Sequence, residues 1–223
     1  AAVGRAVNHR RLRDAAEELT ALTREHEREI AQTGIALHLE DERQETLWRL
    51  SQMGEESIQV ITRFAMEEGV RLTGSKIGYL AFMNEDETVL TMYAWSRVSM
   101  DQCDIIDKPI EYPVEKTGLW GEAVRQRKPI ITNDYYAPNP FKRGIPEGHI
   151  AITRHMNVPI FDEGRIVVVA GVGNKEGLYD DADVRHLLLL MDGMWRIVRQ
   201  KRTIEEYQST HEQMITLSEL KEK

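Results

Sequence analysis

The sequence is short of cysteine and of long apolar runs. Only one of its 223 residues is cysteine, Cys103, which excludes an internal disulfide and an all-cysteine metal site. The longest apolar run, residues 166–172, has the length of a strand and is far below the ~18–20 residues that a membrane span needs. We therefore expect no membrane segment in this chain.

Basic residues are also in the minority. The chain has 29 Lys and Arg against 37 Asp and Glu, a net charge of -8, so we expect neither nucleic acid nor an anionic membrane surface as a partner. Its start lacks both a Met and the apolar region of a signal peptide. We therefore expect a piece of a longer, cytoplasmic protein.

The motifs of common catalytic sites are missing as well. The sequence contains no Gly-x-x-x-x-Gly-Lys-Ser/Thr and no Gly-x-Ser-x-Gly. Gly171 and Gly173 are not followed by the third glycine of a dinucleotide-binding fingerprint. Neither a nucleophile–base pair nor a metal cluster can be recognised, so we do not expect an enzyme.

The most informative stretch that is present is 152–174, in which two apolar runs flank Asp162 to Arg165. This pattern predicts a tight hairpin. The second run, 166–172, is rich in β-branched residues and predicts a strand buried on both faces. In the first run His155 and Asn157 are two residues apart and so share one face of their strand. They form either the wall of a ligand pocket or a satisfied structural pair.

The other segments predict helices at both ends of a mostly antiparallel sheet. In the first half of the chain we expect a helix over 8–52 with a break or bend at Gly34, a helix over 57–72 ended by Thr73-Gly74, and a strand pair 77–83 and 88–96. An edge strand within 109–114, a helix over 117–127 with Thr117 as N-cap, and a strand over 129–132 should follow. A loop over 133–148 then leads to the hairpin, and a last helix runs from about 181 to the end, capped by Asp180 or Asp181. This order indicates an α+β fold.

The two terminal helices carry only sparse apolar stripes, Leu12, Leu19, Leu22 and Ile30 among them. A helix this polar is not stable alone, so we expect a homodimer in which the N- and C-terminal helices of two copies pair as coiled coils. A single solvated helix is the alternative.

Several motifs together resemble a GAF domain over roughly Thr46 to Arg202. They are the strand pair Ile77–Phe82 and Thr88–Trp95, the segment Gly118-Leu119-Trp120-Gly121-Glu122-Ala123-Val124 followed by Lys128-Pro129-Ile130-Ile131-Thr132-Asn133-Asp134-Tyr135, the segment His155-Met156-Asn157-Val158-Pro159-Ile160, and the segment Val169-Ala170-Gly171-Val172-Gly173-Asn174-Lys175. The last two resemble GAF domains of bacterial and archaeal sensor histidine kinases, two-component systems and diguanylate cyclases. The resemblance implies an N-terminal signalling and dimerisation helix over 1–45, a GAF domain over 46–202, and a linker helix over 203–223 that leads to an output domain.

GAF domains hold small molecules between the sheet and the segments that cover it, so the resemblance implies a regulatory sensor that passes a change at its pocket to dimeric helices. The residues expected at the ligand are Trp95, Cys103, Trp120, Asn133, Asp134, Tyr135, His155 and Asn157. Trp95 and Trp120 could equally be ordinary core, and Asn133 and Asp134 could cap the strand end. An interaction module without ligand, used for dimerisation and as a spacer, is the alternative from another class.

The ligand itself is not given by the resemblance. The Asn-Lys-x-x-Phe motif of cyclic-nucleotide GAF domains is incomplete, since Leu178 stands where Phe is needed, and the cysteine contexts of bilin-binding domains are absent. GAF-fold enzymes that reduce free methionine sulfoxide need more than one cysteine. A haem-based redox or gas sensor is a further alternative, with haem attached through Cys103 and His155 as axial ligand, although the Cys-x-x-Cys-His attachment motif is missing.

Overall fold

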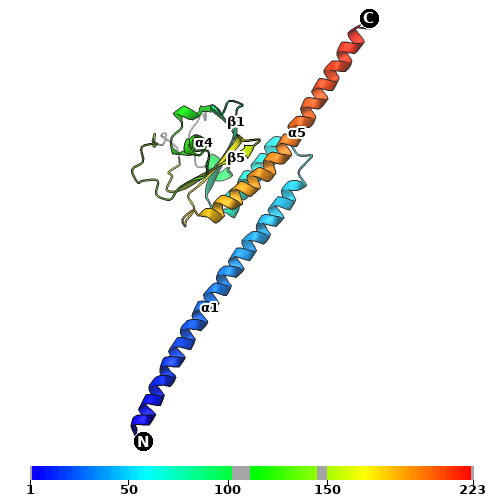
Figure 1. Ribbon diagram of the computed structural model, residues 1–223. Helices are drawn as coiled ribbons and strands as arrows, with labels where there is room; N and C mark the ends of the chain where they lie inside the picture. The colour runs from blue at the N-terminus through cyan, green and yellow to red at the C-terminus, as the bar shows by residue number, and fades with distance from the viewer. Residues whose placement is uncertain (1, 102–110, 145–149, 222–223) are drawn as a thin grey trace. The chain divides into compact units, whose positions relative to one another are not determined.

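The computed structural model describes residues 2–101, 111–144 and 150–221 (Figure 1). The chain divides into two compact units, Ala1–Gln44 and Glu45–Lys223. Its elements are α1 (Ala2–Ser51), α2 (Ile58–Leu72), β1 (Ile77–Met83), β2 (Val89–Trp95), α3 (Arg97–Asp101), β3 (Glu111–Pro113), the 3₁₀ turns η1 (Val114–Lys116) and η2 (Leu119–Gly121), α4 (Glu122–Arg125), β4 (Ile130–Thr132), β5 (His155–Asp162), β6 (Arg165–Gly173) and α5 (Asp181–Lys221).

The long helix α1 accounts for the described residues of the first unit and continues through Gly34. The predicted break there is therefore wrong. A helical glycine costs only about 1 kcal/mol relative to alanine, which the hydrogen bonds of a helix this long outweigh. Thr33, directly before Gly34, donates its hydroxyl to the carbonyl of Glu29 at 2.8 Å, a bond back to the preceding turn that leaves its hydroxyl satisfied within the helix.

The second unit is built on a six-stranded sheet in the order β3-β2-β1-β6-β5-β4, and every neighbouring pair is antiparallel. This confirms the predicted α+β fold. The strand β6 lies between β1 and β5 and is buried along all but its first residue. In the turn between β5 and β6, Glu163 and Gly164 both have positive φ, 51° and 80°, as a two-residue type I′ hairpin requires.

The helices α2 and α5 pack side by side on one face of this sheet (Figure 1). The main core lies between them and the sheet and includes Leu80 of β1, Met156 and Val158 of β5, and Leu187 and Met191 of α5. Side chains alternate along a strand, so the residues between these on β1, β5 and β6 face the other way. A smaller apolar cluster covers part of that second face, formed around Ala81, Leu90, Val114, Val124, Ile166 and Val169.

Side-chain caps fix where α2 and α5 begin. The Ser57 hydroxyl accepts the N–H of Val60 at 3.3 Å. At the start of α5, Asp180 accepts the N–H groups of Ala182 and Asp183 at 2.8 and 3.1 Å, and Asp183 in turn accepts the N–H of Asp180 at 3.1 Å. This reciprocal capping box confirms the cap predicted at Asp180. The N–H of Asp183 is also the main cause that holds the Asp180 pKa below its usual range.

The helix predicted over 117–127 is shorter, and Thr117 is not its N-cap. Thr117 follows the turn η1, and its hydroxyl donates to the Val114 carbonyl at 2.6 Å. The guanidinium of Arg125 binds the carbonyls of Val114, Thr117 and Gly118 at 2.8, 3.2 and 2.6 Å. These bonds hold the segment in two 3₁₀ turns, and only Glu122–Arg125 is α-helical.

The last helix, α5, changes character along its length. One face of its first half is buried, whereas Tyr207 and Met214 in the second half are 72% and 60% exposed. Among the residues that the structure describes, none of the helices combines the length and the hydrophobicity that a membrane span requires.

Candidate functional site

Three polar side chains form a hydrogen-bonded row on the second face of the sheet. His155 and Asn157 of β5 meet on one face, as predicted, with Asn157 Nδ2 at 2.7 Å from His155 Nδ1. The hydroxyl of Tyr79, on β1, donates to Asn157 Oδ1 at 2.8 Å. Both Tyr79 and Asn157 stand opposite Gly171 of β6 in the register of their strands, so the row crosses three neighbouring strands.

Gly171 provides the space that this row needs. A Cβ atom at this position would lie 2.1 Å from Cε1 of Tyr79 and 2.4 Å from Oδ1 of Asn157, well inside van der Waals contact. The central strand is therefore bare where the Tyr79 side chain reaches over it. Glycine here serves the close approach of two side chains rather than a special backbone conformation.

One polar atom of the row has no partner. His155 is 8% exposed, and its Nε2 atom is buried without a hydrogen bond to any described residue. Burial lowers the pKa of His155 to about 4, so the ring is neutral at pH 7. Burial also raises the pKa of Tyr79, which keeps its hydroxyl protonated. A buried polar atom without a partner is rare in folded proteins and calls for a ligand or an ordered water.

Aromatic rings pack against both ends of the row. The Tyr135 ring packs edge-on against His155, with 5.6 Å between ring centroids. Trp120 of η2 packs edge-on against Tyr79 at 5.7 Å and against Tyr112 of β3 at 5.2 Å. Aromatic walls with few polar groups are typical of small-molecule sites.

A positive charge stands beside these rings. The ammonium of Lys142 lies 4.9 Å from the centre of the Tyr135 ring and donates to the Ala137 carbonyl at 3.0 Å. Lys142 therefore links two positions in the loop after β4, the Tyr135 ring and the Ala137 carbonyl. The Tyr135 ring thus contacts both the Lys142 ammonium and the His155 ring.

The remaining predicted site residues divide into three groups. Trp95 of β2 stands opposite Tyr79 in the strand register, which places it on the same face of the sheet, half-buried. Asn133 instead bonds the backbone of Tyr179, accepting its N–H at 2.8 Å and donating to its carbonyl at 3.0 Å. Cys103 lies outside the residues that the structure describes.

Asp134 also has a local role. Its Oδ1 accepts the N–H groups of Tyr136 and Ala137 at 2.9 and 3.2 Å, which is the Asx-turn that the sequence left open as an alternative. Asn133 and Asp134 thus fix the backbone at the start of the loop after β4, on both sides of Tyr135. In the structure both contribute to the position of the ring at the site.

Sequence reasoning missed Tyr79, Gly171 and Lys142. A signal existed for Tyr79, because a phenol within an otherwise apolar strand needs a hydrogen-bond partner when it is buried. For Gly171 and Lys142 the reason is tertiary. Nothing local indicates which side chains cross over Gly171 or which ring Lys142 covers.

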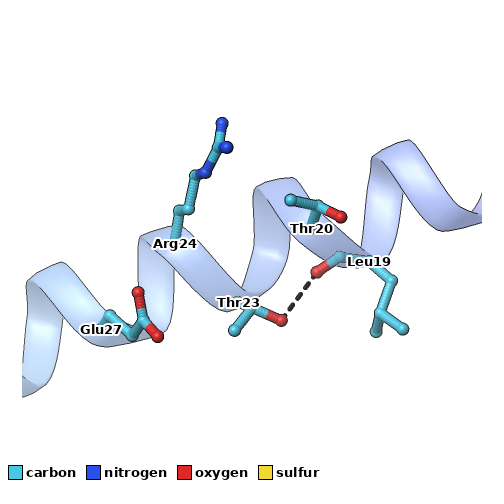
Figure 2. Close-up of a pocket in the computed structure, with 5 residues that line it drawn as sticks. All are labelled: Leu19, Thr20, Thr23, Arg24 and Glu27. Atoms are coloured by element: carbon cyan, nitrogen blue, oxygen red, sulfur yellow. Dashed lines mark hydrogen bonds between the residues drawn. The ribbon is translucent and has the colours of Figure 1, made fainter.

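A separate depression lies on α1, in the first unit. It is lined by Leu19, Thr20, Thr23, Arg24 and Glu27, which follow one another along a single helix (Figure 2), and has a volume of about 330 Å³. The hydroxyl of Thr23 is bonded to the Leu19 carbonyl at 2.8 Å, and these residues are exposed. An open helix face of this kind has no walls and offers little to a small ligand.

The described residues around His155 do not fit a metal ion or a haem iron bound to this side chain. Within the described ranges, no group of three or more His, Cys, Asp or Glu side chains is arranged to hold a metal ion. The amide nitrogen of Asn157 can only donate, so Nδ1 of His155 accepts and the ring proton lies on Nε2. A metal-binding imidazole has the opposite pattern, since it donates from one nitrogen and binds the metal through the bare one.

Comparisons with known proteins agree with this fold. The family model of the GAF domain matches residues 55–199. The methyl sulfide methyltransferase-associated sensor of Methanosarcina acetivorans is 57% identical over 171 residues, which is 77% of this chain and 17% of the relative. The chain thus spans about a sixth of that protein's length.

Solved structures are similar in fold at low sequence identity. The GAF domain of a phosphoenolpyruvate-protein phosphotransferase from Coxiella burnetii has a TM-score of 0.59 and 12% identity, covering 74% of this chain and 96% of that one. Free methionine-R-sulfoxide reductase from Neisseria meningitidis, in complex with its substrate, has a TM-score of 0.53 and 13% identity, covering 71% of this chain and 91% of that one. At such identities the likeness concerns the fold alone.

Proposed function

This chain belongs to the GAF domain family, and from that premise we propose that it is a cytoplasmic sensor module that binds a small molecule at His155 and passes the change to α5. The observation that carries the proposal is the buried Nε2 of His155, which has no hydrogen-bond partner among the described residues, on a ring that packs against Tyr135. A buried polar atom that no hydrogen-bond partner satisfies is costly in an empty protein. A ligand that pairs with this atom would remove that cost.

The strand β5 offers a route from the site to the helix. His155 is its first residue and Asp162 its last. The carboxylate of Asp162 accepts the indole N–H of Trp195 at 3.0 Å and a guanidinium N–H of Arg199 at 2.6 Å. Arg199 also donates to Glu163 at 2.9 Å. A shift of β5 on ligand binding would therefore pull on α5 at the point where its exposed half begins.

The exposed apolar residues of the long helices support a homodimer. Three apolar residues of α1 are exposed, Leu19 by 66%, Leu22 by 57% and Ile30 by 70%. Pairing with a second helix would bury them. In the dimer that we propose, two copies pair through their terminal helices, and a change at α5 becomes a shift between paired helices. The ligand must prefer one of the two states, because equal affinity would transmit nothing.

We propose a regulatory role rather than a catalytic one. The sequence has a single cysteine, whereas reduction of a sulfoxide by thiols needs a second thiol to resolve the oxidised one. The relative from Methanosarcina acetivorans is named a sensor. In the longer protein, residues 203–223 would link the module to an output domain, such as a histidine kinase or a diguanylate cyclase.

Native mass spectrometry of freshly purified protein tests the ligand and the dimer together. We expect the mass of two chains plus small adducts, and an absorption spectrum of the same sample tells a coloured ligand from a colourless one. His155→Phe should lose the adduct, whereas the matched variant His211→Phe, on the exposed part of α5, should keep it. A bare wild-type mass would favour the alternative, a GAF module that serves only as a dimerising spacer.

The route through Asp162 has its own test. In Asp162→Asn we expect unchanged ligand affinity but loss of the ligand-dependent change in amide hydrogen exchange along 195–207. Arg196→Gln is the matched control, because Arg196 lies in the same stretch of α5 and, among the described residues, bonds Asp192 of its own helix rather than β5. An undiminished response in Asp162→Asn would refute this route.

A further inference from the structure

The hydrogen-bonded row Tyr79–Asn157–His155 has a direction. An amide oxygen only accepts and an amide nitrogen only donates. The hydroxyl of Tyr79 therefore donates to Asn157 Oδ1, and Asn157 Nδ2 donates to His155 Nδ1. A neutral imidazole carries one proton, so in this arrangement the proton of His155 lies on Nε2, the atom without a partner.

The reverse arrangement is less favourable. If the amide of Asn157 were turned over, its nitrogen would face the Tyr79 hydroxyl and its oxygen would face His155 Nδ1. The hydroxyl of the half-buried Tyr79 would then lose its acceptor, and the structure shows no other acceptor for it among the described residues. Tyr79 thus sets the orientation of Asn157, and Asn157 sets the tautomer of His155.

We propose that His155 offers Nε2–H as a fixed donor to an oxygen acceptor of the ligand, and that the ligand is a small carboxylate with an aromatic or apolar body. This inference rests on the proposed sensor function and names the chemistry of its ligand. The donor is buried and unsatisfied, so it discriminates against molecules that lack an acceptor at this point. Tyr79 is a positioning residue, since it acts through Asn157.

Charge around the site favours a carboxylate over a neutral carbonyl. Lys142 places its ammonium over the Tyr135 ring. The nearby acidic side chains are already engaged: Asp134 holds backbone N–H groups, and Glu122 is bonded to Arg125 and Gln126. Among the described residues, a negative charge on the ligand would therefore meet the Lys142 ammonium, while the carboxylates of Asp134 and Glu122 are already compensated. The aromatic rings would contact its body.

The tautomer can be measured without any ligand. In ¹⁵N-detected spectra of the wild-type protein we expect the His155 proton on Nε2, with Nδ1 bare. In Asn157→Asp the new carboxylate can only accept, so Nδ1 should acquire a hydrogen while the Tyr79 bond is kept. In Tyr79→Phe the ring packing stays but the amide loses its orientation, and a mixture of tautomers is expected. A bare Nε2 in the wild-type protein would overturn the inference.

The ligand class is tested with benzoate, and with benzylammonium as a matched probe of opposite charge and no acceptor. Benzoate should shift the His155 Nε2–H and Trp120 indole signals, with at least a ten-fold weaker affinity in Asn157→Asp. Equal shifts with benzylammonium, or no shift with benzoate, would overturn the carboxylate assignment. If native mass spectra show a bound ligand and Asn157→Asp does not change the affinity for it, this inference fails while the proposed function stands. A protein that carries no ligand at all refutes the proposed function instead.

Discussion

Gly171→Ala should disrupt the site from the centre of the sheet. The added Cβ would lie 2.1 Å from Tyr79 Cε1 and 2.4 Å from Asn157 Oδ1, where about 3.4 Å or more is usual. Gly171 pairs with β1 and β5 through its backbone, so the strand cannot easily move. The Tyr79 ring and the Asn157 amide must shift instead.

The expected cost follows from these contacts. Overpacking in a well-packed interior costs about 1–3 kcal/mol, and loss of the bond between Tyr79 and Asn157 adds roughly 1 kcal/mol. We therefore expect a decrease of about 2–4 kcal/mol in the free energy of unfolding. For a unit of this size, this corresponds to a fall in Tm of roughly 4–16 °C.

Urea denaturation followed by circular dichroism measures this change. Gly177→Ala is the matched control, because the nearest atom to its added Cβ, Cε of Lys175, is 3.9 Å away; its effect should stay within about 0.5 kcal/mol. In a Tyr79→Ala background Gly171→Ala should cost less, since one of its two clashes is gone, and the double-mutant cycle gives the coupling. A Gly171→Ala protein as stable as the wild type would refute the close approach of Tyr79 and Asn157 over β6.

Three further predictions concern pH, a buried ion pair and a turn. The folded-state pKa of His155, about 4, is below its unfolded value of 6.5, so the unfolded chain takes up the proton first. The stability that neutral His155 contributes is complete above about pH 6.5, and roughly 3 kcal/mol of unfolding free energy is lost as the pH falls to 4. In His155→Phe the urea midpoint should depend less on pH over this range. In the wild type the Lys175 ammonium binds the buried carboxylate of Asp183 at 2.7 and 2.8 Å, and Lys175→Met leaves that carboxylate without its cation. We expect the free energy of unfolding to fall by about 2–4 kcal/mol, and the double variant Lys175→Met with Asp183→Leu should recover part of this loss. An equal loss in the double variant would contradict the prediction. Gly164→Ala puts a Cβ on a residue with φ of 80° and should lower the unfolding free energy by about 1 kcal/mol; an unchanged urea midpoint would argue against the type I′ turn.

Local patterns predicted most of the elements because they act over a few residues. The β-branched run 166–172 and the Asp-Glu-Gly turn before it predicted β6 and its hairpin, and both are confirmed. The amphipathic run from Ser57 predicted α2 and its end at Thr73-Gly74. The helix predicted from Thr117 failed because of a side-chain contact that periodicity does not report: Arg125 binds the carbonyls of Val114 and Gly118 and shortens the helix.

The candidate site was predicted only in part, for the same reason. A period of two residues is enough to put His155 and Asn157 on one face, and their contact confirms it. Their role at a ligand stays a prediction. Asn133 was expected either at the ligand or as a cap of the strand end, and in the structure its amide pairs with the backbone of Tyr179, which is 46 residues away. No periodicity reports such a pairing.

The sequence by itself determined the fold class, the family and the face of β5 that carries the polar pair, since these depend on motifs and on alternation along one strand. Tertiary structure decided which strands lie beside β5 and in which register. That register brings Tyr79, 78 residues before Asn157 in the chain, across Gly171 to the Asn157 amide. It thereby fixes the proton on His155 Nε2, because the direction of a hydrogen-bonded row is set at its far end.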